Sequence, residues 1–205
     1  MMNSSVSGPD GKLRCRWCSA APAFFEYHDT EWGYPVDDDV RLFEKLCLET
    51  FQSGLSWRTI LAKRDNFRAA FLNFDFNQVA KFGEADRERL LLDPGIVRHR
   101  GKIEAVINNA ERACELVSQE GSLAAFFWRF EPQEHELPAP QTTSVSAAST
   151  ALSIALKKQG WKFVGPTTVY AFMQAMGLIN DHANDCAFRQ KVDQARKQFK
   201  RPGLA

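Results

Sequence analysis

The sequence predicts an all-α protein, and three observations support this fold class. Apolar residues recur at the three- and four-residue spacing of amphipathic helices along most of the 205 residues. Residues that favour the start or the end of a helix border these segments. No stretch alternates apolar and polar residues convincingly enough to predict a β-strand. We therefore expect helices packed around a large core, in one domain or in two small lobes.

The first two expected helices have clear start signals. Asp37–Asp39 can cap a helix whose apolar positions run from Val40 to Phe51, and Gly54 ends it. Ser56 can cap a second helix, whose apolar side consists of Trp57, Ile60, Leu61, Phe67 and Phe71.

Further helices are expected over residues 84–92, 103–117, 122–130, 151–159 and 166–176. Pro166 occupies the favoured first position of the last of these helices. Residues 131–149 contain three prolines and many Ser and Thr residues, which predicts a surface loop. We expect a disordered lead-in over residues 1–13, one folded domain over residues 14–188, and a basic tail over residues 189–205.

Composition restricts the possible partners and compartments. The formal net charge is +1, so any nucleic-acid contact must depend on a local basic patch. No run of eighteen apolar residues is present, so we expect no membrane partner. The N-terminus lacks the apolar segment of a signal peptide, and the cysteine count is odd. These two features predict reduced thiols in the cytoplasm.

Cysteine and histidine residues at the two ends of the chain could form a metal site. His182 and Cys186 are four residues apart, which places them on one face if the segment is helical. Cys15 and Cys18 form a Cys-x-x-Cys pair, and His28 follows ten residues later. Two thiolates and two imidazoles suit a closed, tetrahedral zinc site. The spacing alone does not choose between Cys15 and Cys18.

The same cysteine and histidine residues also fit interpretations other than a structural metal site. A single histidine is often an ordinary polar residue, and a single cysteine is often a small buried apolar residue. A redox role for the Cys-x-x-Cys pair would require a surrounding βαβ pattern, which is missing from the sequence. A zinc deaminase would require a His-x-Glu motif, but Asp29 and Thr30 follow His28.

Six ordered motifs resemble those of the 3-methyladenine DNA glycosylase I family: residues 14–17, 27–33, 48–57, 95–103, 162–168 and 180–182. The similarity extends from about Cys15 to Cys186, which is most of the chain. It implies a helix-hairpin-helix DNA glycosylase fold with a structural Zn2+ ion that ties the N- and C-terminal segments together. It also implies that the zinc ligands are Cys15, His28, His182 and Cys186, so that Cys18 is not a ligand.

The resemblance further implies hydrolysis of the N-glycosidic bond of 3-methyladenine by a monofunctional enzyme that leaves an abasic site. The expected partners are double-stranded DNA that contains alkylated adenine and free 3-methyladenine as the product. The protein is expected to act as a monomer. The alternative from a different class is a zinc-stapled helical DNA-binding protein without catalysis.

A base that has been flipped out of DNA needs aromatic surfaces and a polar group that reads its edge. Trp17, Tyr27 and Trp57 are the candidates for stacking, and Glu49 is the candidate reader. A carboxylate in a water-poor pocket attracts a cationic methylated base more strongly than neutral adenine. Without the resemblance, the same residues could be a solvated helix carboxylate and ordinary core aromatics.

The sequence also contains candidate DNA contacts. Gly165 precedes a helix whose free N–H groups could bind a phosphate, and Thr167 and Thr168 could add hydroxyl donors. Leu55 could be the apolar wedge that fills the gap left by the flipped base. The alternatives are an ordinary helix start and a core leucine. Asp181 is interpreted as a structural residue, for example a helix cap.

The sequence departs from the family pattern at several positions. Phe24 stands where some members have a tyrosine, which removes a potential polar contact from the pocket. Pro166 stands where we expect a threonine. The lead-in is longer than expected, and the basic tail matches no part of the family pattern.

Overall fold

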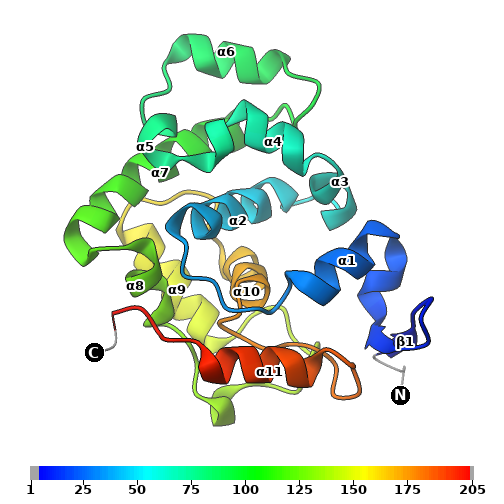
Figure 1. Ribbon diagram of the computed structural model, residues 1–205. Coiled ribbons are helices and arrows are strands. Elements are labelled where there is room, and N and C mark those ends of the chain that lie inside the picture. The colour runs from blue at the N-terminus through cyan, green and yellow to red at the C-terminus, as the bar shows by residue number, and fades with distance from the viewer. Residues whose placement is uncertain (1–4, 204–205) are drawn as a thin grey trace.

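The computed structural model describes residues 5–203, and nearly all of its regular secondary structure is helical, which confirms the all-α class (Figure 1). Its helices are α1 Ala23–Thr30, α2 Asp39–Gln52, α3 Trp57–Ala62, α4 Arg64–Ala70, α5 Phe76–Val79, α6 Glu84–Leu92, α7 Arg100–Glu120, α8 Leu123–Trp128, α9 Ala147–Lys158, α10 Pro166–Ala175 and α11 Arg189–Gln198. Short 3-10 helices are η1 Arg16–Ala20, η2 Leu72–Phe74 and η3 Glu134–Glu136. Two short strands, β1 Ser5–Ser7 and β2 Leu13–Cys15, precede them.

The boundaries of the main helices follow from local side-chain chemistry. The Asp38 carboxylate accepts a hydrogen bond from the Arg41 N–H and caps α2. Ser56, Ser122 and Ser146 cap α3, α8 and α9 in the same way. Gly121 ends α7 with a φ of 85°, a conformation that favours glycine.

Helix α2 lies at the centre of the molecule and contacts α7, α8 and α10 (Figure 1). Residues 45–51 of α2 are all buried, so this helix is enclosed on nearly every side. Helix α10 packs against both α2 and α9. Helix α6 covers one end of the molecule, and α11 and the N-terminal strands lie at the other end (Figure 1).

Two chain segments lie close together where Gly177 passes Tyr34 and Pro35. A Cβ on Gly177 would lie 2.5 Å from the Pro35 nitrogen, so only glycine fits at this position.

The N-terminal segment differs from the disordered lead-in expected over residues 1–13. Residues 1–4 lie outside the described residues, but β1 and β2 form an antiparallel hairpin in which Ser5 pairs with Cys15. Arg14 fixes this hairpin because its guanidinium binds the carboxylates of Asp10 and Asp29. The strands were not expected because each has only three residues, which is too short for a detectable alternating pattern.

The segment expected as one helix after Ser56 is divided into α3 and α4. Lys63 separates them with φ and ψ angles of −104° and 4°. Helices α1 and α5 were not expected, because each is short and has a weak apolar periodicity.

The expected basic tail contains α11, which packs against the rest of the protein; residues 204–205 lie outside the described residues. Arg196 and Arg201 both form ion pairs with Glu131. Phe199 packs on Trp128 with 4.6 Å between ring centroids. Residues of the expected tail thus contact the preceding part of the chain through Glu131 and Trp128.

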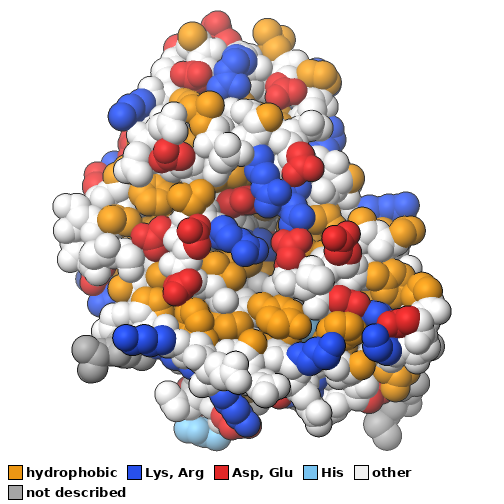
Figure 2. All heavy atoms as spheres, viewed as in Figure 1, with side chains coloured by type: hydrophobic (Ala, Val, Ile, Leu, Met, Phe, Trp, Pro, Cys, Tyr) orange, Lys and Arg blue, Asp and Glu red, His pale blue; other side chains and the backbone are white. Residues whose placement is uncertain are grey.

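The surface carries both signs of charge. Lys and Arg side chains are interspersed with Asp and Glu side chains over the face seen in Figure 2. Among the described helices, none has the length and apolar character required to cross a membrane.

Candidate active site and metal centre

A cavity of about 520 Å³ opens between α1, α2, α3 and α10. Its aromatic wall contains Trp17, Phe24, Tyr27, Trp32, Trp57 and Tyr170. Its polar wall contains Glu49, Gln52, Gln141, Thr143, Ser144, Thr167, Gln174 and Asp181. A cavity of this size that combines aromatic rings with convergent polar groups is typical of a binding site for a small molecule.

The structure brings together all four residues that the sequence suggested for base binding. Trp17 packs edge-on against Tyr27 with 6.2 Å between centroids, and Tyr27 packs against Trp57 with 5.2 Å between centroids. Trp17 also contacts Trp32 at 5.1 Å and Phe24 at 5.8 Å. These contacts form a connected aromatic wall beside Glu49.

Glu49 is buried and forms an ion pair with a residue that the sequence analysis did not identify. Lys45 lies one helical turn before it on α2, and 2.7 Å separates the Lys45 Nζ from the Glu49 Oε1. The same ammonium donates to the Tyr27 hydroxyl at 2.8 Å and lies 3.4 Å from the centroid of the Trp57 ring. Burial lowers the pKa of Lys45, and the Glu49 carboxylate opposes this shift.

Two polar groups of the cavity wall have no hydrogen-bond partner within residues 5–203. They are the indole N–H of Trp57 and the hydroxyl of Tyr170. Burial raises the pKa of Tyr170 to about 12, so this hydroxyl stays protonated at neutral pH. Buried polar groups usually have partners, so these two groups are exceptions in the cavity wall.

Asp181 lies in the cavity wall and does not cap a helix. Its carboxylate accepts hydrogen bonds from the Gln141 backbone N–H at 2.9 Å and from the Gln174 side chain at 2.5 Å. Burial raises its pKa. Asp181 therefore holds the loop that contains Gln141 against α10.

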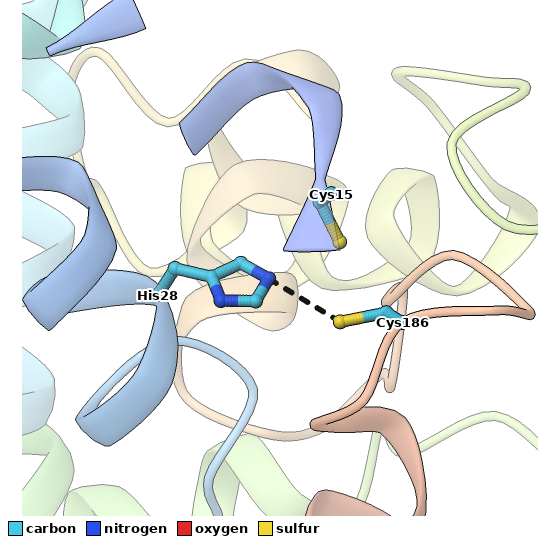
Figure 3. Close-up of side chains that lie close together, drawn as sticks. All are labelled: Cys15, His28 and Cys186. Carbon is cyan, nitrogen blue, oxygen red and sulfur yellow. Dashed lines mark hydrogen bonds between the residues drawn. The ribbon is translucent and has the colours of Figure 1, made fainter. Parts of the chain in front are cut away.

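Three potential metal ligands converge next to this cavity (Figure 3). Cys15 ends β2, His28 belongs to α1, and Cys186 lies in the loop before α11. One ligand atom from each residue lies within 4.8 Å of the other two, and 3.6 Å separates the His28 Nε2 from the Cys186 Sγ. Metal–ligand bonds of about 2.0–2.3 Å in a tetrahedron place neighbouring ligand atoms about 3.5 Å apart, so the separation of the His28 and Cys186 atoms is compatible with a shared metal ion.

Neighbouring groups orient the two histidines of this region. The His28 Nδ1 lies 2.8 Å from Asp29, which leaves its Nε2 free toward Cys186. The His182 Nδ1 lies 2.9 Å from the Asn180 side-chain oxygen, and the His182 Nε2 is buried without a hydrogen-bond partner in the described part of the chain. Burial lowers the pKa of His182 to about 4, so the ring is neutral at pH 7. A neutral imidazole with one oriented N–H is the form that ligates metals.

His182 lies beside these three residues but outside the group whose ligand atoms are within 4.8 Å of one another. The His28 and His182 ring centroids lie 4.8 Å apart. Gly33 leaves space for the His182 ring, because its φ is +88° and a Cβ there would lie 2.8 Å from the His182 Cε1. Cys18 lies elsewhere, in a small buried cluster with Ala21 and Phe24.

Of the candidate DNA contacts, Thr167 lines the base cavity, whereas Leu55, Gly165 and Thr168 do not. Leu55 follows the turn at Gly54 and is 43% exposed, so it is not a core leucine. Gly165 is the N-cap of α10 with an ordinary φ of −64°, and Thr168 lies in the first turn. Thr167 is exposed and also lines the base cavity.

Lys102, in the first turn of α7, connects this helix to the end of α2. Its ammonium is buried and donates to the backbone carbonyls of Phe51 and Ser53. The lysine thus caps the C-terminal end of α2, next to Leu55. It is therefore not a free phosphate-binding group.

Several residues of the site have no distinctive signal in the sequence. Trp32, Tyr170 and Gln174 belong to the cavity wall, but their positions indicate only helix or core. Lys45 and Glu49 are four residues apart on a helix, which is typical of an exposed ion pair. The burial of all residues from 45 to 51 is what makes this pair unusual.

Comparisons with known proteins agree with this arrangement. A family described as methyladenine glycosylase matches residues 17–190. DNA-3-methyladenine glycosylase 1 of Escherichia coli is 49% identical over 179 residues, which cover 84% of this chain and 95% of that protein. DNA-3-methyladenine glycosylase of Haemophilus influenzae is 43% identical over 180 residues, which cover 84% and 96%.

Solved structures are similar over the same part of the chain. A crystal structure of a 3-methyladenine DNA glycosylase I has a TM-score of 0.80 and 47% identity, and covers 85% of this chain and 98% of that one. A Tyr-to-Phe variant in complex with 3-methyladenine also has a TM-score of 0.80, with 36% identity and coverage of 85% and 96%. The protein whose cavity and cysteine–histidine cluster are described above therefore belongs to the methyladenine glycosylase family.

Proposed function

We propose that this protein excises 3-methyladenine from alkylated DNA by hydrolysing the N-glycosidic bond, and that it leaves an abasic site. The observation that carries this proposal is the position of the buried Glu49 carboxylate beside the aromatic wall of the cavity. Its relatives are named as 3-methyladenine DNA glycosylases, and one similar structure is described as a complex with 3-methyladenine.

In this proposal, the cavity holds the flipped base between aromatic rings. Trp17, Tyr27 and Trp57 supply stacking surfaces, and Glu49 accepts hydrogen bonds from the edge of the base. Adenine methylated at N3 is a cation while it is joined to the sugar. When the bond from N9 to C1′ breaks, its electron pair neutralises the base, and water adds to C1′ and loses a proton. The positive charge makes the base a good leaving group, so little acid catalysis is required.

We infer that the substrate is double-stranded DNA, because a protein that flips a base needs a wedge to fill the gap. The exposed Leu55 after Gly54 suits this role. We also propose that the protein is a monomer in the cytoplasm. The five cysteines are free thiols, which is consistent with a reducing compartment.

We propose that Cys15, His28, His182 and Cys186 bind one structural zinc ion. The convergence of three ligand atoms and the unpartnered Nε2 of buried His182 support this set. Zinc would supply a crosslink between α1, β2 and the loop before α11, and all four positions would be occupied by protein. The residues that surround the base, rather than the metal, then carry the chemistry.

Gly33→Ala is expected to weaken metal binding, because a methyl group at residue 33 would push the His182 ring. The positive φ adds a backbone cost of about 1–2 kcal/mol. Gly121→Ala is the matched control, since its φ is +85° and its surroundings are open. Measurement of zinc per chain should show loss in the first variant only. Equal zinc content in the two variants would argue against His182 as a ligand.

We propose that the turn before α10 binds a DNA phosphate through free helical N–H groups and the hydroxyls of Thr167 and Thr168. Gly165→Leu should leave the fold intact, because the φ is ordinary and no atom lies within 4 Å of a new Cβ. It should weaken binding to methylated and unmethylated duplexes alike, by about tenfold, since phosphate contacts position DNA without specifying its sequence.

Gly83→Leu is the matched control for this experiment. Gly83 is the N-cap of α6 and also has open space around it. Its substitution should not change DNA binding in a filter-binding or anisotropy titration. If Gly165→Leu reduced binding only to the lesion-bearing duplex, the phosphate assignment would be wrong.

The activity itself is tested by incubating purified protein with methylated DNA and measuring the released bases. We expect free 3-methyladenine and abasic sites without strand cleavage. A zinc-stapled DNA-binding protein without catalysis would bind the DNA and release no base.

A further inference from the structure

Lys45 contacts three of the four residues proposed to bind the base. Its ammonium pairs with Glu49 at 2.7 Å, donates to the Tyr27 hydroxyl at 2.8 Å, and lies 3.4 Å from the centroid of the Trp57 ring. Lys45 is only 5% exposed, so these contacts replace its contacts with water. A buried ion pair gains little stability over apolar residues of similar size, which suggests that this pair has another role.

The ammonium does not itself line the base cavity. It lies in a smaller hollow of about 20 Å³, which Tyr27 and Trp57 also line. These two rings thus contribute to the walls of both spaces. The other cations of this hollow have other partners, since Arg41 and Arg64 pair with Glu31 and Arg68 pairs with Glu44.

Glu49 lines the base cavity, and Lys45 pairs with its Oε1. This arrangement assigns the other carboxylate oxygen, Oε2, to a ligand. The Tyr27 oxygen accepts from Lys45, so the tyrosine O–H remains available as a donor. Lys45 therefore fixes the orientation of two polar groups and balances the charge of one.

We propose that Lys45 is a specificity-determining positioning residue, the internal counter-ion that makes the recognition group Lys45–Glu49 neutral before the cationic base enters. This inference rests on the proposed role of Glu49. The base loses its positive charge when the glycosidic bond breaks, so an unbalanced carboxylate would hold the bound substrate more tightly than the transition state. Interactions of that kind tighten binding without accelerating the chemical step.

Lys45→Met should therefore lower both kinetic constants, so that binding tightens while the chemical step slows. The methionine has a similar length and no charge, so the pocket becomes more negative. The half-saturation concentration for methylated DNA should fall, and the maximal single-turnover rate constant should also fall. A purely structural role for Lys45 would instead weaken binding and reduce the rate, in proportion to lost stability.

The decisive test is a double-mutant cycle. Glu49→Gln alone leaves the Lys45 ammonium buried without its counter-ion, where it repels a cationic base. Lys45→Met in the Glu49→Gln background should recover binding of 3-methyladenine-containing DNA by about tenfold relative to Glu49→Gln alone, since one repulsive charge is removed near the base. A double variant that binds as weakly as Glu49→Gln, or more weakly, would overturn the proposal.

Two controls separate this result from other effects. Lys81→Met in the Glu49→Gln background removes an exposed positive charge outside the cavity, so it should give no recovery. Lys45→Arg keeps the charge and should retain the wild-type value of each of the two kinetic constants. If Glu49→Gln behaved as wild type, both the role of Glu49 and this inference would fail. A loss in Glu49→Gln that Lys45→Met does not relieve would reject only the counter-ion role.

Discussion

Glu49→Gln should reduce recognition of 3-methyladenine by about tenfold to a hundredfold, which corresponds to roughly 1–3 kcal/mol. Glutamine keeps the shape of the side chain but removes the charge, and a charge-assisted hydrogen bond is about twice as strong as a neutral one. The substitution also removes the partner of buried Lys45, 2.7 Å away, so the loss should lie toward the upper end of this range.

Excision by Glu49→Gln should decrease without disappearing, because the cationic base retains its own tendency to leave. A general-base mechanism predicts a different result, since removal of the base typically costs about 10²–10⁴-fold in rate. The two cases are separated by measuring 3-methyladenine binding and single-turnover excision for wild type, Glu49→Gln and Glu49→Ala. Unchanged base binding in both variants would reject Glu49 as the reader. Intact binding with complete loss of excision would make it a catalytic base.

Loss of the metal should produce the second large effect. Purified protein should contain one zinc per chain, and Cys15→Ala should lose it. The free energy of binding a structural zinc contributes directly to folding, so the melting temperature should fall by on the order of 10 °C. The N-terminal hairpin and the loop before α11 should become sensitive to proteases, because Cys15 and Cys186 connect these two segments.

Cys18→Ala is the natural control for this experiment. Cys18 is fully buried like Cys15 and lies only three residues away, but it packs against Ala21 and Phe24. This variant should keep its zinc and lose only the stability of a small packing contact, about 1 kcal/mol. If Cys18→Ala lost the metal and Cys15→Ala kept it, the ligand assignment would have to change.

Much of the helical framework could be predicted from apolar spacing and capping residues. Helices α2, α7 and α10 have long apolar faces or clear terminal signals, and the structure places them close to the expected residues. The break between α3 and α4 at Lys63 could not be predicted, because the apolar spacing continues across it. The N-terminal hairpin could not be predicted either. Its strands have three residues each, and contacts of Arg14 with Asp10 and Asp29, rather than an alternating sequence pattern, fix them.

The candidate site was predictable only in part. Residue spacing suggested cysteine and histidine ligands but did not choose between Cys15 and Cys18, because tertiary structure decides which sulfur faces His28. Glu49 and Trp57 could be proposed from the family motif. The ion pair of Lys45 with Glu49 could not be proposed from the sequence. The same pair on a half-exposed helix would be solvated and would contribute little to stability.

The central claim is that 3-methyladenine binds in the cavity beside Glu49, and the five tryptophans allow a direct test. Trp17, Trp32 and Trp57 line the cavity, whereas Trp128 and Trp161 are buried elsewhere in the core. Single Trp→Phe substitutions would assign the five indole N–H signals in a ¹⁵N-labelled sample. Titration with 3-methyladenine should shift the signal of Trp57, which lines the cavity, and leave in place that of Trp161, which does not. A saturating titration that leaves the signals of the three cavity tryptophans unchanged would contradict this account.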